Sequence, residues 1–183
     1  MSESKILELC KRRVSCRNYL EKPVPDEIIA NCLEAARWAP SACNKQPWRF
    51  VIVKDTELRR KICKEGFLPG VPMPWAQKAP VVIALCAKTN PITHGLAPMV
   101  SGINYQYIDI GIAGEHFVLA AEEQGLSTCW IGWFKVKYVK KLLKLPSTVK
   151  PVCLLTLGYA AEPPSPVKRI PLDELVRENT WKD

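Results

Sequence analysis

Hydrophobic positions along the chain recur with two different periods, one typical of helices and one typical of strands. Apolar residues three and four apart predict helices at residues 4–13, 26–39, 56–64, 104–124, 136–144 and 172–177. Runs of apolar or β-branched residues predict strands at residues 49–54, 80–87, 128–131 and 152–159. Helices and strands therefore alternate irregularly, which favours a layered α+β domain.

Two of these segments are apolar on nearly every side and should form the centre of the fold. Pro80–Ala87 is an uninterrupted apolar run, which is typical of a strand covered on both faces. The helix expected at 104–124 is apolar around almost its whole circumference, and Gly125 is a natural C-terminal stop for it. We expect both segments to be buried.

The ionisable residues of the long helix receive no catalytic role from the sequence. Glu122 and Glu123 lie near its end and are expected to face solvent, and Asp109 has no assignment. The two histidines are His94 and His116, and His116 lies within this helix, where a structural role is expected.

The chain length of 183 residues fits one domain, residues 1–183, with its loops marked by polar and proline-rich segments. Pro40–Trp48 is expected to be a compact polar loop. Residues 66–75, which contain three prolines and two glycines, and residues 89–102 are expected to be irregular.

The charge balance indicates an anionic partner. Lys and Arg number 26 against 18 Asp and Glu, which gives a formal net charge of +8. This excess suits a phosphate-bearing cofactor, a nucleotide or nucleic acid. The basic runs, such as Lys11–Arg13, are short, and no recognition-helix or RNA-binding motif accompanies them, so nucleic acid is not indicated.

The cysteines and the missing targeting segment both indicate a reducing, cytoplasmic setting. The N-terminal residues mix charged with apolar side chains, and the uncharged stretch 89–108 contains prolines, so neither a secretory signal nor a membrane helix is expected. The eight cysteines form no C-x-x-C pair, so no zinc or iron–sulfur site is expected. We expect all eight to be thiols, with Cys32, Cys86 and Cys153 buried.

A basic segment directly after the first helix has the residue types of a phosphate clamp. Arg13, Ser15 and Arg17 alternate with Val14 and Cys16, so an extended segment would place the first three on one side. Two guanidinium groups and a hydroxyl could hold a phosphate by charge-assisted hydrogen bonds, each worth roughly 1.5–3 kcal/mol. A solvated basic patch has the same composition, and this segment alone does not separate the two interpretations.

The loop Pro40–Trp48 has the residue types that recognise a flat heteroaromatic ring. Prolines stiffen it, and Ser41, Asn44 and Gln46 offer a hydroxyl and two amides, which match donors and acceptors at the polar rim of such a ring. An ordinary loop anchored by Trp48 is the alternative interpretation.

Together these segments resemble the nitroreductase family of flavoproteins. The matching segments, in order along the chain, are Arg13–Arg17, Val24–Pro25, Ala35–Phe50, Leu119–Ala121, Gly125–Gly132 and Arg169–Leu172. The resemblance therefore spans nearly the whole chain. It implies a three-layer fold with a central mixed or antiparallel sheet flanked by helices, and a domain-swapped homodimer with two FMN molecules at the subunit interface.

The resemblance also implies which residues contact FMN. Those expected at the ribityl phosphate and nearby flavin atoms are Arg13, Val14, Ser15, Arg17 and Arg169. Those expected to close on the flavin from the partner subunit are Pro40, Ser41, Ala42, Asn44 and Gln46. Ile131 and Gly132, with Trp133 beside them, are expected along the isoalloxazine ring. The family often has a basic residue where this chain has Val167, and the sequence leaves open whether Lys168 takes its place.

For activity, the resemblance implies an FMN-dependent oxidoreductase that uses NADH or NADPH to reduce nitroaromatics, quinones or similar electron-poor small molecules by a ping-pong mechanism. The flavin carries the chemistry, so no catalytic side chain is expected, and the glycines form no separate nicotinamide-binding motif. The loops 66–75 and 89–102, with Phe67, Trp75 and Trp133, are expected to shape the acceptor pocket.

Three other functions stay open at this point. One is a specialised flavin reaction such as reductive dehalogenation. Another is a flavin-binding or redox-sensing protein with little turnover. The third is a basic nucleic-acid-binding domain, whose support is the +8 charge.

Overall fold

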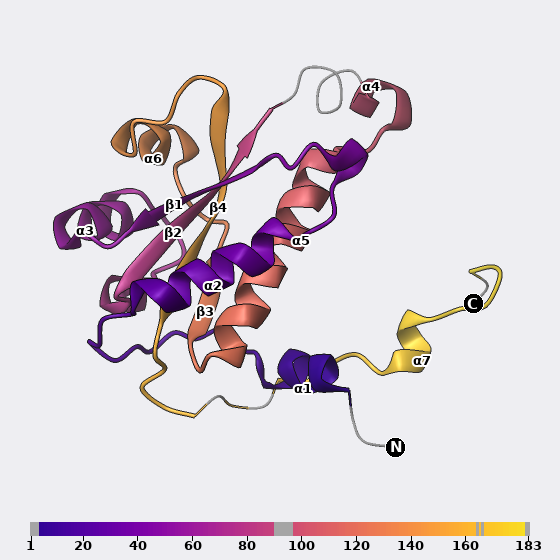
Figure 1. The fold of residues 1–183 in the computed structure, drawn as a ribbon, viewed down its shortest axis with the longest axis horizontal. Coiled ribbons are helices and arrows are strands. Elements are labelled where there is room, and N and C mark those ends of the chain that lie inside the picture. The colour runs from indigo at the N-terminus through magenta and orange to yellow at the C-terminus, as the bar shows by residue number, and fades with distance from the viewer. Residues whose placement is uncertain (1–3, 90–96, 164, 166, 182–183) are drawn as a thin grey trace.

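The computed structural model describes residues 4–89, 97–163, 165 and 167–181 and shows a four-stranded sheet with helices packed on both faces (Figure 1). The strands are β1 (Trp48–Val53), β2 (Val81–Lys88), β3 (Ser127–Ile131) and β4 (Val149–Gly158). The α-helices are α1 (Lys5–Arg12), α2 (Asp26–Arg37), α3 (Thr56–Glu65), α4 (Ala97–Ser101), α5 (Tyr105–Glu123), α6 (Val136–Leu142) and α7 (Leu172–Leu175). Short 3-10 helices lie at η1 (Ala42–Asn44) and η2 (Pro74–Lys78). The strand order is β1-β2-β4-β3 with every neighbouring pair antiparallel, so the expected α+β class is confirmed.

Strand β2 is covered on both faces, as its apolar sequence predicts. Val81 and Ile83 belong to the same core cluster as Phe117 of α5, whereas Val82 and Ala84 belong to a cluster with Ile62 of α3. Because successive side chains of a strand point to opposite faces, these clusters lie on opposite sides of the sheet. Helices α2 and α5 therefore form one layer, and α3 and α6 form the other.

Helix α5 approaches the sheet closely at a glycine. A Cβ atom at Gly114 would lie 2.2 Å from Trp130 Cη2 and 2.8 Å from Leu85 Cδ2, so a larger residue would push the helix away from the sheet. At Gly111, by contrast, a Cβ would meet nothing within 4 Å, because this residue lies on an exposed side of the helix.

Two of the differences from the expected elements concern strand β4 and residues 97–101. Strand β4 begins at Val149 because Pro151 is accommodated at a register shift opposite Cys86, where its missing N–H is tolerated. The expectation of an irregular segment throughout 89–102 was wrong, because Ala97–Ser101 forms the short helix α4. Residues 90–96, including His94, lie outside the described residues.

The segment after β4 leads away from the sheet. Figure 1 shows this chain, in yellow, passing α1 and continuing through α7 at a distance from the sheet. All of its described side chains from Val167 to Trp181 are exposed. The large apolar side chains among them are Val167, Ile170, Leu172, Leu175, Val176 and Trp181.

Candidate functional site

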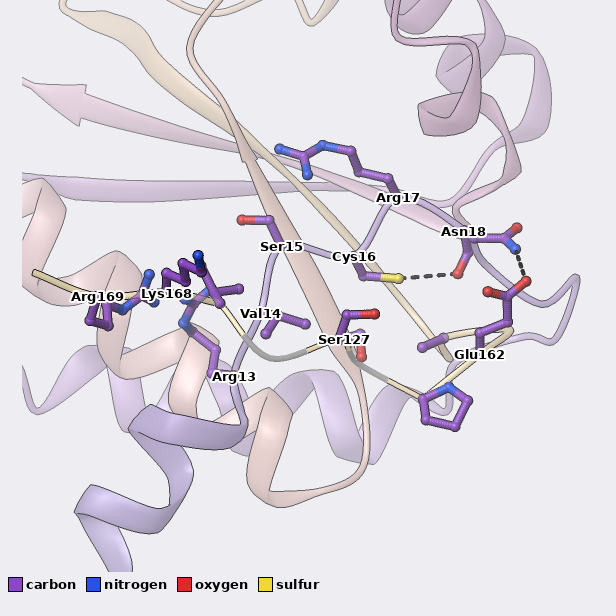
Figure 2. A pocket seen from close by; sticks show the side chains of 14 residues that line it. Arg13, Val14, Ser15, Cys16, Arg17, Asn18, Ser127, Glu162, Lys168 and Arg169 are labelled. Atoms are coloured by element: carbon purple, nitrogen blue, oxygen red, sulfur yellow. Dashed lines mark hydrogen bonds between the residues drawn. The ribbon is translucent and has the colours of Figure 1, made fainter.

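A hollow of ≈ 660 Å³ lies where the segment after α1 meets the chain that follows β4 (Figure 2). Its lining residues are Arg13, Val14, Ser15, Cys16, Arg17, Asn18, Ser127, Ala160, Glu162, Pro163, Ser165, Val167, Lys168 and Arg169. Segments from both ends of the chain therefore meet here. Six residues expected at the cofactor from sequence are among them, namely Arg13, Val14, Ser15, Arg17, Lys168 and Arg169.

The clamp segment is extended because it adds to the edge of the sheet. Ser15 forms a parallel bridge with Thr128, and the backbone N–H of Cys16 donates to Thr128 O at 2.9 Å. Cys16 consequently points into the protein and is buried. Figure 2 shows the Ser15 hydroxyl and the Arg17 guanidinium on the same side of this backbone. The expected alternation is therefore confirmed for Ser15, Cys16 and Arg17.

A buried tyrosine holds the far end of this segment. Tyr19 Oη lies 2.7 Å from Thr156 Oγ1 of β4 and donates to the backbone oxygen of Cys16 at 3.1 Å. Burial raises the pKa of the Tyr19 phenol far above its ordinary value, so the phenol keeps the proton that it donates. The clamp is thereby fixed to the centre of the sheet.

Two arginines at the end of α1 are held by carboxylates of α5. Arg12 Nε donates to Glu122 Oε1 at 2.7 Å, and Arg12 Nη2 donates to the backbone oxygen of Glu122 at 2.8 Å. Arg13 Nε lies 4.0 Å from Glu115 Oε1. The expectation that Glu122 faces solvent was wrong: its side chain is only 12% exposed, because α1 packs against α5.

The spacing of these two glutamates along the sequence indicates that both face the same neighbour. Glu115 and Glu122 are seven residues apart, about two helical turns, so they lie on one face of α5. Their partners Arg12 and Arg13 are adjacent in sequence, just where α1 ends. Knowledge that α1 crosses α5 was needed to pair them.

The hollow is strongly cationic. Arg13, Arg17, Lys168 and Arg169 line it, against the carboxylate of Glu162. Figure 2 shows Glu162 on the opposite side of the hollow from Arg169, where it accepts a hydrogen bond from Asn18 Nδ2 at 3.3 Å. A phosphate monoester would complement this concentration of positive charge.

Behind the hollow, Glu115 faces Arg13 from α5. Burial raises the pKa of the Glu115 carboxyl above its ordinary value, and the neighbouring Arg13 charge opposes that rise. The carboxylate thus orients Arg13 from the protein side and leaves the other side of the guanidinium to the hollow.

The loop expected at the flavin ring lies outside this hollow. Pro40, Ser41, Ala42, Asn44 and Gln46 are not among its lining residues. The loop lies instead against α5, where the backbone N–H of Ala42 donates to Asp109 Oδ1 at 3.0 Å. Within one chain, therefore, the structure does not bring these residues to the clamp.

The segment expected beside the isoalloxazine ring begins at the last residue of β3 and also lies outside the hollow. Ile131 is the last residue of β3 and is buried in the core, whereas Gly132 and Trp133 are exposed. Trp133 Nε1 donates to Pro69 O at 2.8 Å, which joins this segment to the loop 66–75.

That loop encloses a second hollow of ≈ 700 Å³. Its lining residues are Cys63, Lys64, Phe67, Leu68, Pro69, Gly70, Val71, Pro72, Met73, Pro74, Gln77 and Lys135. Of the aromatic residues expected at an acceptor pocket, Phe67 lines this hollow. Trp75 packs instead against the core clusters.

No group of three His, Cys, Asp or Glu side chains in 4–89, 97–163, 165 and 167–181 could hold a metal ion. None of the described helices has the length and apolar character needed to cross a membrane.

Comparison with known proteins agrees with this architecture. The model of the family "Nitroreductase family" matches residues 10–71 and 68–159. The FMN reductase [NAD(P)H] of Bacillus subtilis is 31% identical over 183 residues, covering 91% of this chain and 70% of that protein. An iodotyrosine deiodinase of Thermotoga neapolitana is 27% identical, covering 96% and 98%. A nitroreductase family protein of Clostridium difficile superimposes with a TM-score of 0.79 at 28% identity, covering 98% and 100%.

Proposed function

The chain belongs to the nitroreductase family and is an FMN-dependent NAD(P)H oxidoreductase, and we propose that it reduces nitroaromatics, quinones or similar electron-poor small molecules. The observation that carries the proposal is the hollow in which Arg13 and Arg17, from one end of the chain, meet Arg169 from the other. Guanidinium groups that converge from separate segments are suited to a phosphate, which accepts several charge-assisted hydrogen bonds at once.

In this proposal the cationic hollow holds the phosphate end of FMN. Arg13, Lys168 and Arg169 would surround the phosphate, and Ser15 and Arg17 would contact flavin atoms farther along the extended segment. When bound, FMN would supply the two-electron redox chemistry. The protein contributes position, positive charge and exclusion of water.

The ring end of the cofactor would be completed by a second copy of the chain. The loop residues Pro40, Ser41, Ala42, Asn44 and Gln46 lie outside the hollow of their own chain, which suits a role at the partner's flavin. The exposed apolar side chains between Val167 and Trp181 also need a covering surface, because such patches usually mark an interface. We therefore include a homodimer in the proposal.

The acceptor would bind beside Gly132 and Trp133. The hollow enclosed by the loop 66–75 adjoins this segment through the Trp133–Pro69 hydrogen bond. Its lining is largely apolar, with Phe67 and Met73, as expected for an aromatic ligand. NADH or NADPH and the acceptor would use the same face of the cofactor in turn, in a ping-pong order.

The proposal is tested by the absorbance spectrum of the purified protein. A yellow, FMN-loaded protein should be bleached within the mixing time of NADH or NADPH and recoloured by a quinone or a nitroaromatic under anaerobic conditions. Parallel double-reciprocal plots against donor and acceptor would support the ping-pong order. Yellow protein that neither donor bleaches would contradict the reductase and favour a flavin-binding role.

Reductive dehalogenation is a second candidate, favoured by the similarity to the iodotyrosine deiodinase of Thermotoga neapolitana. A halogenated phenol is flat and largely apolar and would suit the same acceptor hollow. Release of iodide from 3-iodotyrosine by the reduced protein, measured with an iodide electrode, would support this reaction. A protein that oxidises NAD(P)H with quinones but releases no iodide would exclude it.

A further inference from the structure

Helix α5 carries a buried carboxylate that the proposed cofactor contacts do not use. Asp109 is 3% exposed, and its Oδ1 accepts a hydrogen bond from the backbone N–H of Ala42 at 3.0 Å. An aspartate is seldom buried to this degree unless it is paired with a donor. Here one donor belongs to the backbone of the loop Pro40–Trp48, so the hydrogen bond joins the carboxylate to the loop.

This loop has a conformation that needs support from its surroundings. Cys43, Asn44 and Gln46 have positive φ angles of 51°, 52° and 46°, in the left-handed region that side chains disfavour. This conformation is unfavourable for residues that carry a side chain, and it persists only when neighbouring structure holds it.

Hydrogen bonds within the loop close it on itself. The backbone N–H of Gln46 donates to Ser41 Oγ at 2.9 Å, and that of Asn44 donates to Ser41 O at 3.0 Å. The Gln46 side-chain amide donates to Asn44 Oδ1 at 3.0 Å. These bonds define the shape of the loop, whereas the bond between Ala42 and Asp109 joins that shape to α5.

We infer that Asp109 is a positioning residue for the cofactor: it holds the loop at the depth and orientation at which Asn44 and the loop backbone meet the flavin ring of the second copy. This inference rests on the function proposed above. In this inference Asp109 acts through the loop.

The hydrogen bond can be removed from either side. Asp109→Ala removes the acceptor, whereas Ala42→Pro removes the donor from a different element. Proline is compatible with this position, because Ser41 is extended (φ −149°, ψ 157°) and Ala42 begins the 3-10 turn. Asp109→Asn is the matched control, because its amide oxygen can accept the same hydrogen bond.

We expect Asp109→Ala and Ala42→Pro each to raise the Kd for FMN about tenfold, with Asp109→Asn within about threefold of the parent. The double variant should also bind FMN about tenfold more weakly than the parent, because both substitutions remove the same hydrogen bond. Independent effects would multiply to about a hundredfold. Multiplied effects, or an Asp109→Asn variant as weak as Asp109→Ala, would overturn the inference.

Hydrogen exchange of the flavin-free protein gives a readout that does not depend on cofactor. The Gln46 amide should lose protection in Asp109→Ala and keep it in Asp109→Asn. If Asp109→Ala loses this protection but binds FMN with the affinity of the parent, Asp109 holds the loop but the loop position does not affect flavin binding. That result would overturn the positioning role. If the parent takes up no FMN at all, the proposed function fails, and the exchange experiment still decides whether Asp109 holds the loop.

Discussion

The Arg13 side chain contacts a carboxylate of the protein on one side and faces the cationic hollow on the other. Its Nε faces Glu115 of α5 at 4.0 Å, and the same residue lines the cationic hollow. The carboxylate reduces the freedom of a long side chain before any ligand arrives, so less entropy is lost on binding. Arg13 should therefore contribute more to phosphate binding than an unrestrained surface arginine.

We predict that Arg13→Ala weakens FMN binding by roughly 10- to 100-fold, because it removes about 1.5–3 kcal/mol of charge-assisted hydrogen bonding. The midpoint of urea unfolding of the flavin-free protein should change little by comparison. Fluorescence titration with FMN measures the first effect. Arg60→Ala is the matched control, because Arg60 is an exposed arginine of α3 paired with Glu57. Retention of flavin at parental affinity would disprove the clamp assignment.

At the same scale, the buried thiols should make stability depend on alkaline pH. Burial raises the pKa of Cys86 to about 12, whereas an unfolded thiol titrates near 8.5–9. The folded state keeps the proton that the unfolded state loses, so the free energy of unfolding falls as pH rises above about 9. Cys32, Cys63 and Cys153 shift in the same direction.

Cys86→Val should therefore reduce the loss of stability between pH 7.5 and pH 10 by about 1.5 kcal/mol, since about 1.4 kcal/mol accompanies each pH unit above the unfolded pKa. Urea unfolding at both pH values measures this difference. Cys10→Ser, at an exposed cysteine, should leave the loss unchanged. Equal losses in parent and Cys86→Val would contradict the prediction.

At the scale of elements, α5 connects the separate parts of the site. Glu115 and Glu122 hold the arginines at the end of α1, and Asp109 holds the loop expected at the flavin ring. The helix can do this only because it lies close to the sheet, where Gly114 leaves room for Trp130. A shift of α5 would therefore move the clamp and the loop together.

Gly114→Ala should lower the free energy of unfolding by about 2–3 kcal/mol, because its Cβ would overlap Trp130 and Leu85. Gly111→Ala has open space and should raise helix stability by about 0.5–1 kcal/mol in the isolated chain. Chemical unfolding of both variants under dilute conditions tests this contrast. Similar destabilisation by the two substitutions would show that α5 does not pack as described.

At the scale of the whole molecule, the exposed apolar surface suits the proposed homodimer. The segment 167–181 exposes large apolar side chains along its length, and α5 exposes Tyr107 and Ile108 near Gly111. Lys168 and Arg169 lie at the start of this segment and line the cationic hollow. Dimer formation and cofactor binding should therefore be coupled through it.

Deletion of residues 167–183 should abolish the proposed dimer and FMN retention together. Lys168→Ala combined with Arg169→Ala keeps the apolar residues and should weaken FMN binding while the dimer persists. Sedimentation velocity and flavin absorbance distinguish these outcomes. A truncated chain that stays dimeric would show that the segment does not hold the two copies together.

Most elements could be predicted from the sequence because their signals are local. The continuous apolar run of β2 predicted a strand buried on both faces, and the alternation Arg13, Ser15, Arg17 predicted the extended clamp. The apolar circumference of α5 predicted a buried helix, but the structure buries only part of its surface and leaves Tyr107 and Ile108 exposed. Helix α4 was missed, because a helix of five residues has too few positions to show a period.

The sequence by itself determined the layered α+β fold, the family and the residue types of a phosphate clamp, because each depends on spacing along the chain. Only the tertiary structure decided which distant residues meet: Arg169 joins Arg13 and Arg17 around one hollow, Glu122 pairs with Arg12, and Asp109 holds Ala42. Such pairings depend on how helices cross and strands register, and packing of the whole chain sets those geometries.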